Sequence, residues 1–247
     1  MLSFMIAPDF PPEQFAGWHM FNTHLQRLTD NVVHLITPAS YPEQNELINA
    51  QKVSLIYANP FDASVLVREK GYLPLVRPIG QSDEMVIAAP VDGVNHSDDL
   101  TAGCKILVTD NHDIQLIGLR LLESANLSND DITWLSADTF QEAARRLIAH
   151  EADAAFFLSS TFHGFSATTK KSIKPIMESR INDLSHVILL HPDFADYQDI
   201  FREAFLKISQ SPAGKMVLED LMIPNGFEVL SQEDIEFMID LIETLHD

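Results

Sequence analysis

The run Val53-Ser54-Leu55-Ile56-Tyr57-Ala58-Asn59-Pro60 is the stretch of sequence that decides the fold. Residues 52–58 are mostly apolar and are bounded by polar residues and proline, which predicts a buried strand. Residues 61–70, directly after this run, are predicted to form a helix. A strand that passes straight into a helix is the unit of a mostly parallel sheet wrapped by helices.

The same alternation extends from this run in both directions. Toward the N-terminus, residues 2–7 and 31–37 are predicted strands, and residues 12–30 and 42–50 are predicted helices. Toward the C-terminus, residues 72–77 and 84–89 are further extended segments. The first part of the chain is therefore expected to form one α/β lobe.

A second unit repeats this pattern. Residues 105–108, 132–135 and 152–158 are predicted strands with helices between them. Asp110 and Asp113 have capping-box-like spacing ahead of the first helix, and Asp138 with Gln141 is predicted to open the second. Asp110 follows a strand and precedes a helix, as Asp9 does in the first unit, so two similar lobes are expected.

The last part of the chain differs from both units. Residues 187–190 form a predicted strand that crosses back from the second lobe to the first. Helices are predicted at residues 193–210 and 212–221, and Ser231 with Asp234 forms a capping box for a final helix. The predicted fold class is α/β with two similar lobes joined by hinge strands. Lobe 1 is expected to comprise residues 1–84 plus 190–247, and lobe 2 residues 85–189.

Composition argues against several classes of function. The chain of 247 residues carries 16 Lys and Arg against 36 Asp and Glu, for a net charge of −20. Such a surface repels nucleic-acid phosphates and anionic lipids, so nucleic-acid binding is not expected. The single Cys104 forms no internal disulfide and is interpreted as a small buried residue at a strand start. The ten histidines are dispersed, so no metal site is predicted.

The sequence also lacks the common catalytic and cofactor motifs. It contains no phosphate loop, no dinucleotide-binding glycine turn, no zinc-binding H-E-x-x-H or C-x-x-C, and no nucleophile elbow. No cofactor and no enzymatic activity are therefore expected.

The N-terminal residues bear on localisation. A secretory leader needs a basic first region, and the first Lys or Arg here is Arg27. No stretch approaches the roughly 18 apolar residues of a membrane span, so membrane insertion is not expected. As written, the protein is expected in the cytoplasm; it is expected in the periplasm if a leader is missing from this sequence.

Several segments in order resemble a known family. Ser40-Tyr41, the run at 53–60, Met85-Val86-Ile87-Ala88 and Ala152-Asp153-Ala154-Ala155 are similar to the phosphonate/phosphate-type solute-binding proteins of ABC importers. The resemblance extends from about Met5 to Phe227. It implies the type II periplasmic-binding-protein fold, with the ligand held in a cleft between two lobes. It also implies that Tyr41 contacts the ligand and that the loop from Asn59 to Asp62 lines the cleft.

The chain departs from the family pattern at two places. The family's Ser-Thr-Ser segment, which holds an oxyanion at a helix N-terminus, aligns with Asp110-Asn111-His112, and Asp113 follows where the family has Gly. A second ligand-contacting Tyr aligns near Ser82-Asp83-Glu84, where no aromatic residue is present. Carboxylates at these places repel a phosphonate dianion, so a cationic, zwitterionic or hydroxyl-rich ligand is expected.

Three hypotheses follow. The first is a cytoplasmic sensor or atypical receptor for a small-molecule ligand, with an ABC permease or a signalling protein as partner. Its predicted ligand-binding residues are Asp9, Tyr41, Asn59, Asp62, Asp83, Asn111 and His112. The second is an enzyme on the same fold, similar to thiamine-pyrimidine synthases, with His112 beside Asp110 or Asp113 as an acid/base pair. The third is a protein-interaction module without a small ligand.

Overall fold

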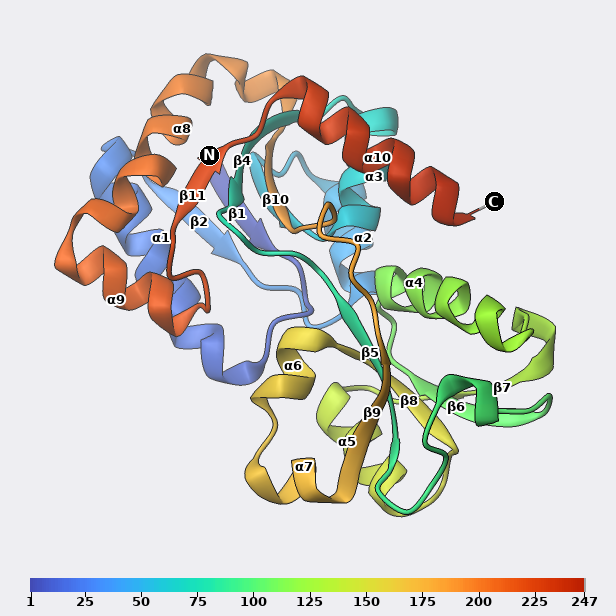
Figure 1. Cartoon of the computed structure of the whole chain (residues 1–247). Coiled ribbons are helices and arrows are strands. Elements are labelled where there is room, and N and C mark those ends of the chain that lie inside the picture. The colour runs from blue at the N-terminus through green and yellow to red at the C-terminus, as the bar shows by residue number, and fades with distance from the viewer. Residues whose placement is uncertain (247) are drawn as a thin grey trace. The chain divides into compact units, whose positions relative to one another are not determined.

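The computed structural model describes the backbone of residues 1–246 and the side chains through residue 245. The chain divides into two α/β lobes, each with its own sheet (Figure 1). Lobe 1 comprises Met1–Ser82 and Asp183–Thr244, and lobe 2 is formed by Asp83–Asn182. The predicted fold class is confirmed. The return to lobe 1 comes earlier than the predicted boundary at 189/190, because all of Val187–Leu190 pairs within the sheet of lobe 1.

The sheet of lobe 1 has six strands. Their order across the sheet is β11 (Phe227–Val229), β4 (Leu73–Pro78), β10 (Val187–Leu190), β3 (Leu55–Ala58), β1 (Leu2–Ile6) and β2 (Val33–Ile36). Strand β1 is parallel to both β2 and β3, whereas β10 is antiparallel to β3 and β4. Every residue of β1 and β10 is buried, which explains why both read as continuous apolar runs.

Helices cover both faces of this sheet. The chain steps in one direction from β1 to β2 and in the other from β2 to β3, so right-handed crossovers place α1 (Phe15–Thr29) and α2 (Tyr41–Ala50) on opposite faces. Helices α8 (Gln198–Lys207) and α9 (Pro212–Asp220) pack with α1. An aromatic cluster fills this layer, in which Phe4 contacts Trp18, Phe21 and Phe205 with ring centroids 6.0–6.3 Å apart.

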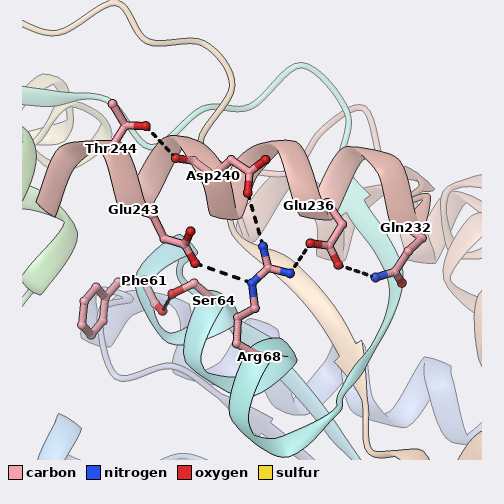
Figure 2. A network of polar contacts seen from close by, with 8 residues as sticks. All are labelled: Phe61, Ser64, Arg68, Gln232, Glu236, Asp240, Glu243 and Thr244. Atoms are coloured by element: carbon pink, nitrogen blue, oxygen red, sulfur yellow. Dashed lines mark hydrogen bonds and ion pairs between the residues drawn. The ribbon is translucent and has the colours of Figure 1, made fainter. Parts of the chain in front are cut away.

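The layer that holds α2 also contains α3 (Pro60–Lys70) and α10 (Gln232–His246). Arg68 of α3 reaches three carboxylates of α10, those of Glu236, Asp240 and Glu243 (Figure 2). The apolar stripe of α10 faces the core, where Ile235, Met238, Ile239 and Ile242 are buried.

The start of α10 matches the sequence prediction. The Ser231 side chain accepts a hydrogen bond from the Asp234 backbone N–H at 3.1 Å, and the Asp234 carboxylate accepts from the Ser231 backbone N–H at 3.2 Å. The predicted capping box is confirmed.

Lobe 2 repeats the core of lobe 1. Its five-stranded sheet has the order β7 (Ile132–Ser136), β6 (Cys104–Val108), β8 (Ala154–Leu158), β5 (Met85–Pro90) and β9 (Ile173–Glu178). Strand β6 is parallel to β7 and β8, as β1 is parallel to β2 and β3, and each lobe adds an antiparallel strand beside its third parallel strand. The expected similarity of the two lobes is therefore present at the level of strand order.

Four helices belong to lobe 2: α4 (His112–Leu122), α5 (Phe140–Ile148), α6 (Ser159–Gly164) and α7 (Ala167–Ser172). Short 3-10 turns complete the two lobes at Pro12–Gln14, Ser97–Asp99, Glu123–Ala125, Asn129–Asp131, Pro192–Tyr197 and Ile208–Gln210. Across residues 1–246, no helix is both long and apolar enough to cross a bilayer.

Two predicted helix starts need correction. The cap of α4 is Asn111, not Asp110, because the Asn111 Oδ1 accepts a hydrogen bond from the Ile114 backbone N–H at 3.1 Å. The cap of α5 is Thr139, not Asp138, because its hydroxyl accepts from the Glu142 backbone N–H at 3.1 Å. In both cases the cap is the residue directly before the first helical residue, and its side chain accepts from the third helical N–H.

The segment from α6 to β9 has no counterpart in the sequence prediction. Residues 159–172 are rich in Ser and Thr, which compete with the backbone for hydrogen bonds and obscure a helical pattern. Strand β9 contains Lys174 and Pro175, and proline is tolerated there because β9 is the edge strand of its sheet.

Cys104 is the first residue of β6, and its thiol is buried and free. Burial and the nearby Asp153 carboxylate raise the pKa of this thiol. The group is therefore a poor nucleophile, consistent with its interpretation as a packing residue.

Candidate functional site

The candidate site of lobe 1 lies where its parallel strands end. Asp9 follows β1, Tyr41 opens α2 after β2, and Asn59 caps α3 after β3. Because the carboxyl ends of parallel strands meet at one edge of the sheet, these side chains converge. The sequence predicted Asp9 for this reason, whereas Tyr41 and Asn59 were predicted from the family resemblance; the structure brings all three into direct contact.

The Tyr41 phenol lies at the centre of this contact. Its hydroxyl donates to the Asp9 carboxylate at 2.9 Å and accepts from the Asn59 amide nitrogen at 3.2 Å. The Asn59 amide oxygen accepts in turn from the Asp62 backbone N–H at 2.8 Å, which fixes the orientation of the amide. One chain of hydrogen bonds therefore runs from the start of α3 to Asp9.

Asp62 is held at the side of this chain. Its carboxylate accepts a hydrogen bond of 2.6 Å from the side-chain amide of Gln44, which is itself buried at 1% exposure on α2. Gln44 thus links α2 to the first turn of α3. Gln44 is not marked in the sequence, since a glutamine within a predicted helix gives no signal of burial.

His186 is the principal site residue that the sequence analysis missed. Its Nε2 lies 3.0 Å from Oδ2 of Asp9, and the two side chains are only 12% and 6% exposed. The imidazole stacks on the ring of Tyr57 with centroids 4.9 Å apart. His186 directly precedes β10, whose first residue Val187 pairs with Ala58, so antiparallel pairing places it at the same sheet edge.

The environment of Asp9 determines its charge. Burial raises the pKa of this carboxyl, but attraction to the His186 imidazole and hydrogen bonds from His186 and Tyr41 outweigh burial, so the pKa lies below its usual value of 3.8. Asp9 is therefore ionised at neutral pH. Its Oδ2 accepts from both partners, so Asp9 orients the side chains of Tyr41 and His186.

The predicted residues of lobe 2 lie in two separate places. Asn111 and His112 are adjacent at the start of α4, where Asn111 is buried as the cap and His112 is exposed. Asp113 follows in the first turn and is 2% exposed. Half-buried Asp83 precedes β5, and β8 separates that strand from β6, which leads into α4.

Three helices begin with the same two features, a side-chain cap and an acidic residue in the first turn. The helices α2, α3 and α4 are each capped by a side chain of their own preceding residue, namely Ser40, Asn59 and Asn111. Each also carries an acidic residue in its first turn: Glu43, Asp62 and Asp113. These carboxylates already complement the positive end of each helix dipole, so the helix starts attract a dianion less than uncharged ones do.

The described side chains at this edge do not form a candidate metal site. Among the side chains described, those of residues 1–245, no group of three or more from His, Cys, Asp and Glu is placed to hold a metal ion. The donors at the lobe 1 site are a phenol, an amide and an imidazole, which suit a polar organic ligand.

Solved structures of binding proteins share this fold. The chain aligns with PhnD1 of Prochlorococcus marinus (MIT 9301) in complex with methylphosphonate, with a TM-score of 0.81 and 10% identity, over 99% of this chain and 98% of that one. It aligns with a binding protein component of an ABC phosphonate transporter from Pseudomonas aeruginosa with a TM-score of 0.83 and 15% identity, over 98% and 86%. A Xanthomonas citri protein, XAC2383 bound to ATP, gives a TM-score of 0.78 and 10% identity, over 100% and 98%.

The structural matches are 10–15% identical in sequence and establish the fold alone, so the family has to come from comparison of sequences. No curated protein sequence matches the chain. The family model for the periplasmic substrate-binding protein of phosphonate ABC transporters matches residues 4–235, which is nearly the whole chain. The chain therefore belongs to the phosphonate-type substrate-binding protein family of ABC transporters.

Proposed function

We propose that this chain is a solute receptor whose ligand contacts are built on the Tyr41 network of lobe 1 and the start of α4 in lobe 2. The observation that carries the proposal is the Asp9–Tyr41–Asn59 hydrogen-bond chain closed by His186. A hydrogen-bonded network of this kind fixes the orientation of its polar groups, which favours recognition of a small polar ligand.

The proposed ligand is cationic, zwitterionic or hydroxyl-rich, not a phosphonate dianion. Asp110 and buried Asp113 bracket the start of α4, and the Asn111 side chain already occupies the Ile114 N–H. A dianion at this position meets two carboxylates and fewer available N–H groups. A ligand with an amine or with hydroxyl groups gains from the same carboxylates.

In this proposal the working step is a shift in the population of lobe arrangements. A ligand that binds residues of both lobes favours the arrangement in which they close around it. A partner protein, either an ABC permease or a signalling protein, then reads the closed state. With a permease as partner the chain is a transport receptor, and with a signalling protein as partner it is a cytoplasmic sensor.

We favour binding over catalysis for the Asp9–His186 pair. An Asp–His pair orients an imidazole for acid/base chemistry, but His186 stacks on Tyr57 and its Nε2 is directed at Asp9. This arrangement keeps the Nε2 proton within the pair. Turnover of the ligand that binds most tightly would contradict this view.

A thermal-shift screen tests the proposal. The purified chain is mixed with phosphate, alkylphosphonates, nucleotides, amines, amino acids and sugars. A ligand at one hundred times its Kd adds about 2.7 kcal/mol of stability. We expect the largest shift from an amine, an amino acid or a polyol.

Matched variants make the screen specific. Tyr41→Phe removes the central hydroxyl and should reduce the shift, whereas Tyr197→Phe removes a hydroxyl on the 3-10 turn Pro192–Tyr197 and should leave it unchanged. A largest shift from phosphonates would contradict the proposed ligand class. The absence of any shift would contradict the receptor function itself.

A further inference from the structure

Lobe 2 carries a surface groove of about 270 Å³ that has no lining residue on α4. Four residues of α5 line one wall: Gln141, Ala144, Arg145 and Ile148. Their spacing of three and four positions places them on one face of the helix. Phe165 and Thr169 form the other wall, so the groove runs between α5 and α7.

The wall that contains Phe165 is apolar and packs on other aromatic rings. The Phe165 ring contacts Phe157 of β8 edge-on at 5.3 Å and Phe162 of α6 at 6.2 Å. Ile148 leaves 37% of its surface exposed at the rim. An apolar surface that is held in place and still open to solvent gains free energy when another apolar side chain covers it.

The groove also presents an exposed cation, the guanidinium of Arg145. Among the side chains of residues 1–245, the Arg145 guanidinium has no hydrogen-bond or ion-pair partner. Its neighbour Arg146 is fully engaged, with Glu151 at 2.8 Å and the Ser136 carbonyl oxygen at 2.6 Å. Glu142, one turn before Arg145, is held by the Asp138 backbone N–H and by Arg146.

The surrounding sequence strengthens this local positive charge. Residues 159–177, which form α6, α7 and most of β9, contain Lys170, Lys171 and Lys174 but no Asp or Glu. The chain as a whole has a net charge of −20, so most of its surface repels an acidic partner. The groove between α5 and α7 is a place where an acidic partner meets apolar surface and positive charge together.

We propose that this groove docks an acidic, amphipathic segment of a partner protein. An apolar side chain of the segment packs on Ile148 and Phe165, and an adjacent carboxylate pairs with Arg145. Complementary charge at the rim directs the encounter, and the apolar contact holds the segment in place. The inference does not depend on the identity of the solute.

Selection from a random library of displayed 15-residue peptides tests this docking surface. The full chain is the bait, and the double variant Arg145→Gln/Ile148→Ser is the counter-selection bait. We expect the peptides that survive to combine a large apolar residue with Asp or Glu within four positions.

Binding of a selected peptide is then measured by fluorescence anisotropy. Arg145→Gln and Ile148→Ser should each weaken binding at least tenfold, and raised salt should weaken binding to the parent chain more than to Arg145→Gln. Lys215→Gln, an equal change of charge on α9 of lobe 1, should leave the affinity within twofold. Circular dichroism confirms that the variants are folded.

Three results would overturn the inference. The first is no enrichment over the double variant, and the second is enrichment of basic or uncharged peptides. The third is binding that Arg145→Gln and Ile148→Ser leave unchanged, which places the peptides elsewhere on the chain. Saturation with the solute tests the receptor function separately, because the solute site and this groove share no residue.

Discussion

The Asp9 carboxylate and the His186 imidazole form a buried pair, 3.0 Å from Oδ2 to Nε2, across 177 positions of sequence. The pair exists because β10 returns to lobe 1 antiparallel to β3, beside the strand ends that carry Tyr41 and Asn59. The segment that completes the sheet thus also completes the site. Ligand binding and the stability of lobe 1 should therefore share these residues.

Removal of the Asp9 charge should destabilise the chain. Asp9→Asn leaves the buried His186 without its carboxylate, and breaking a buried pair costs about 3 kcal/mol. Urea unfolding at pH 7 measures this loss. Asp196→Asn changes an exposed carboxylate on the 3-10 turn before α8 and should leave the free energy of unfolding unchanged.

The same pair predicts a direction of pH dependence. Because the folded pKa of Asp9 is lowered, the unfolded state takes up the proton first, and the ionised carboxylate stabilises the fold above an unfolded value of about 3.9. This stability is lost as the pH falls through the lower folded value. The difference in unfolding free energy between the parent and Asp9→Asn should therefore shrink below about pH 4. A difference that grows on acidification would contradict the assignment.

The site could be predicted only where a local pattern marked it. Asp9 was identified because it follows a strand, and parallel strands bring their carboxyl ends together. Tyr41 and Asn59 were identified from the segments that resemble the solute-binding family. His186 precedes a strand that runs the opposite way, so it carries no such signal. In the sequence His186 is only a polar residue next to the apolar run at 187–190. Its place in the site becomes visible once that run is known to pair with β3.

The fold was more predictable than the details of its helix starts. Apolar runs or periodic apolar residues mark most of the strands and helices outside the segment from α6 to β9, so one ambiguous residue changes little. A cap depends on one side chain, and Asp110 and Asn111 are both good caps, as are Asp138 and Thr139. Backbone geometry in the folded state decides between such neighbours, and the sequence alone does not contain it.

The acidic residues at the start of α4 should control ligand class. Asp110→Ser with Asp113→Gly removes two negative charges beside the Asn111 cap, and each charge near a helix start is worth about 1 kcal/mol. Affinity for methylphosphonate should rise at least tenfold, which isothermal titration calorimetry measures. Asp98→Ser with Asp130→Ser removes equal charge elsewhere in lobe 2 and should not raise it. Equal affinity in all three proteins would show that α4 does not contact the anion.

Gly118 tests the packing of lobe 2. A Cβ atom at this position would lie 2.2 Å from Cε2 and 2.6 Å from Cζ of Phe156, a buried ring of β8. Gly118→Ala should cost about 1–3 kcal/mol through overpacking, measured by urea unfolding. A Cβ at Gly164 meets no atom within 4 Å, so Gly164→Ala should be close to neutral. A neutral Gly118→Ala would contradict the close contact between α4 and β8.

Arg68 should anchor α10 to α3. Arg68→Met removes the shared cation of Glu236, Asp240 and Glu243 and leaves three like charges on one helix face. The Tm should fall, and the fall should be smaller at high salt because salt screens both the lost attraction and the new repulsion. Lys207→Met breaks a single exposed pair with Glu203 and should change the Tm less. In Arg68→Met, amide hydrogen exchange should accelerate relative to the parent chain in α10 more than in α8, which would place the loss of stability at α10.

Calorimetric titration of the strongest ligand from the screen into the parent chain and into Tyr41→Phe tests the central claim most directly. The Tyr41 hydroxyl links Asp9 to Asn59, and its removal leaves both with a lost hydrogen bond at the centre of the site. We predict saturable binding of one ligand per chain, at least tenfold weaker in Tyr41→Phe and unchanged in Tyr197→Phe. Equal affinity in all three proteins would place the ligand away from this network and contradict the account.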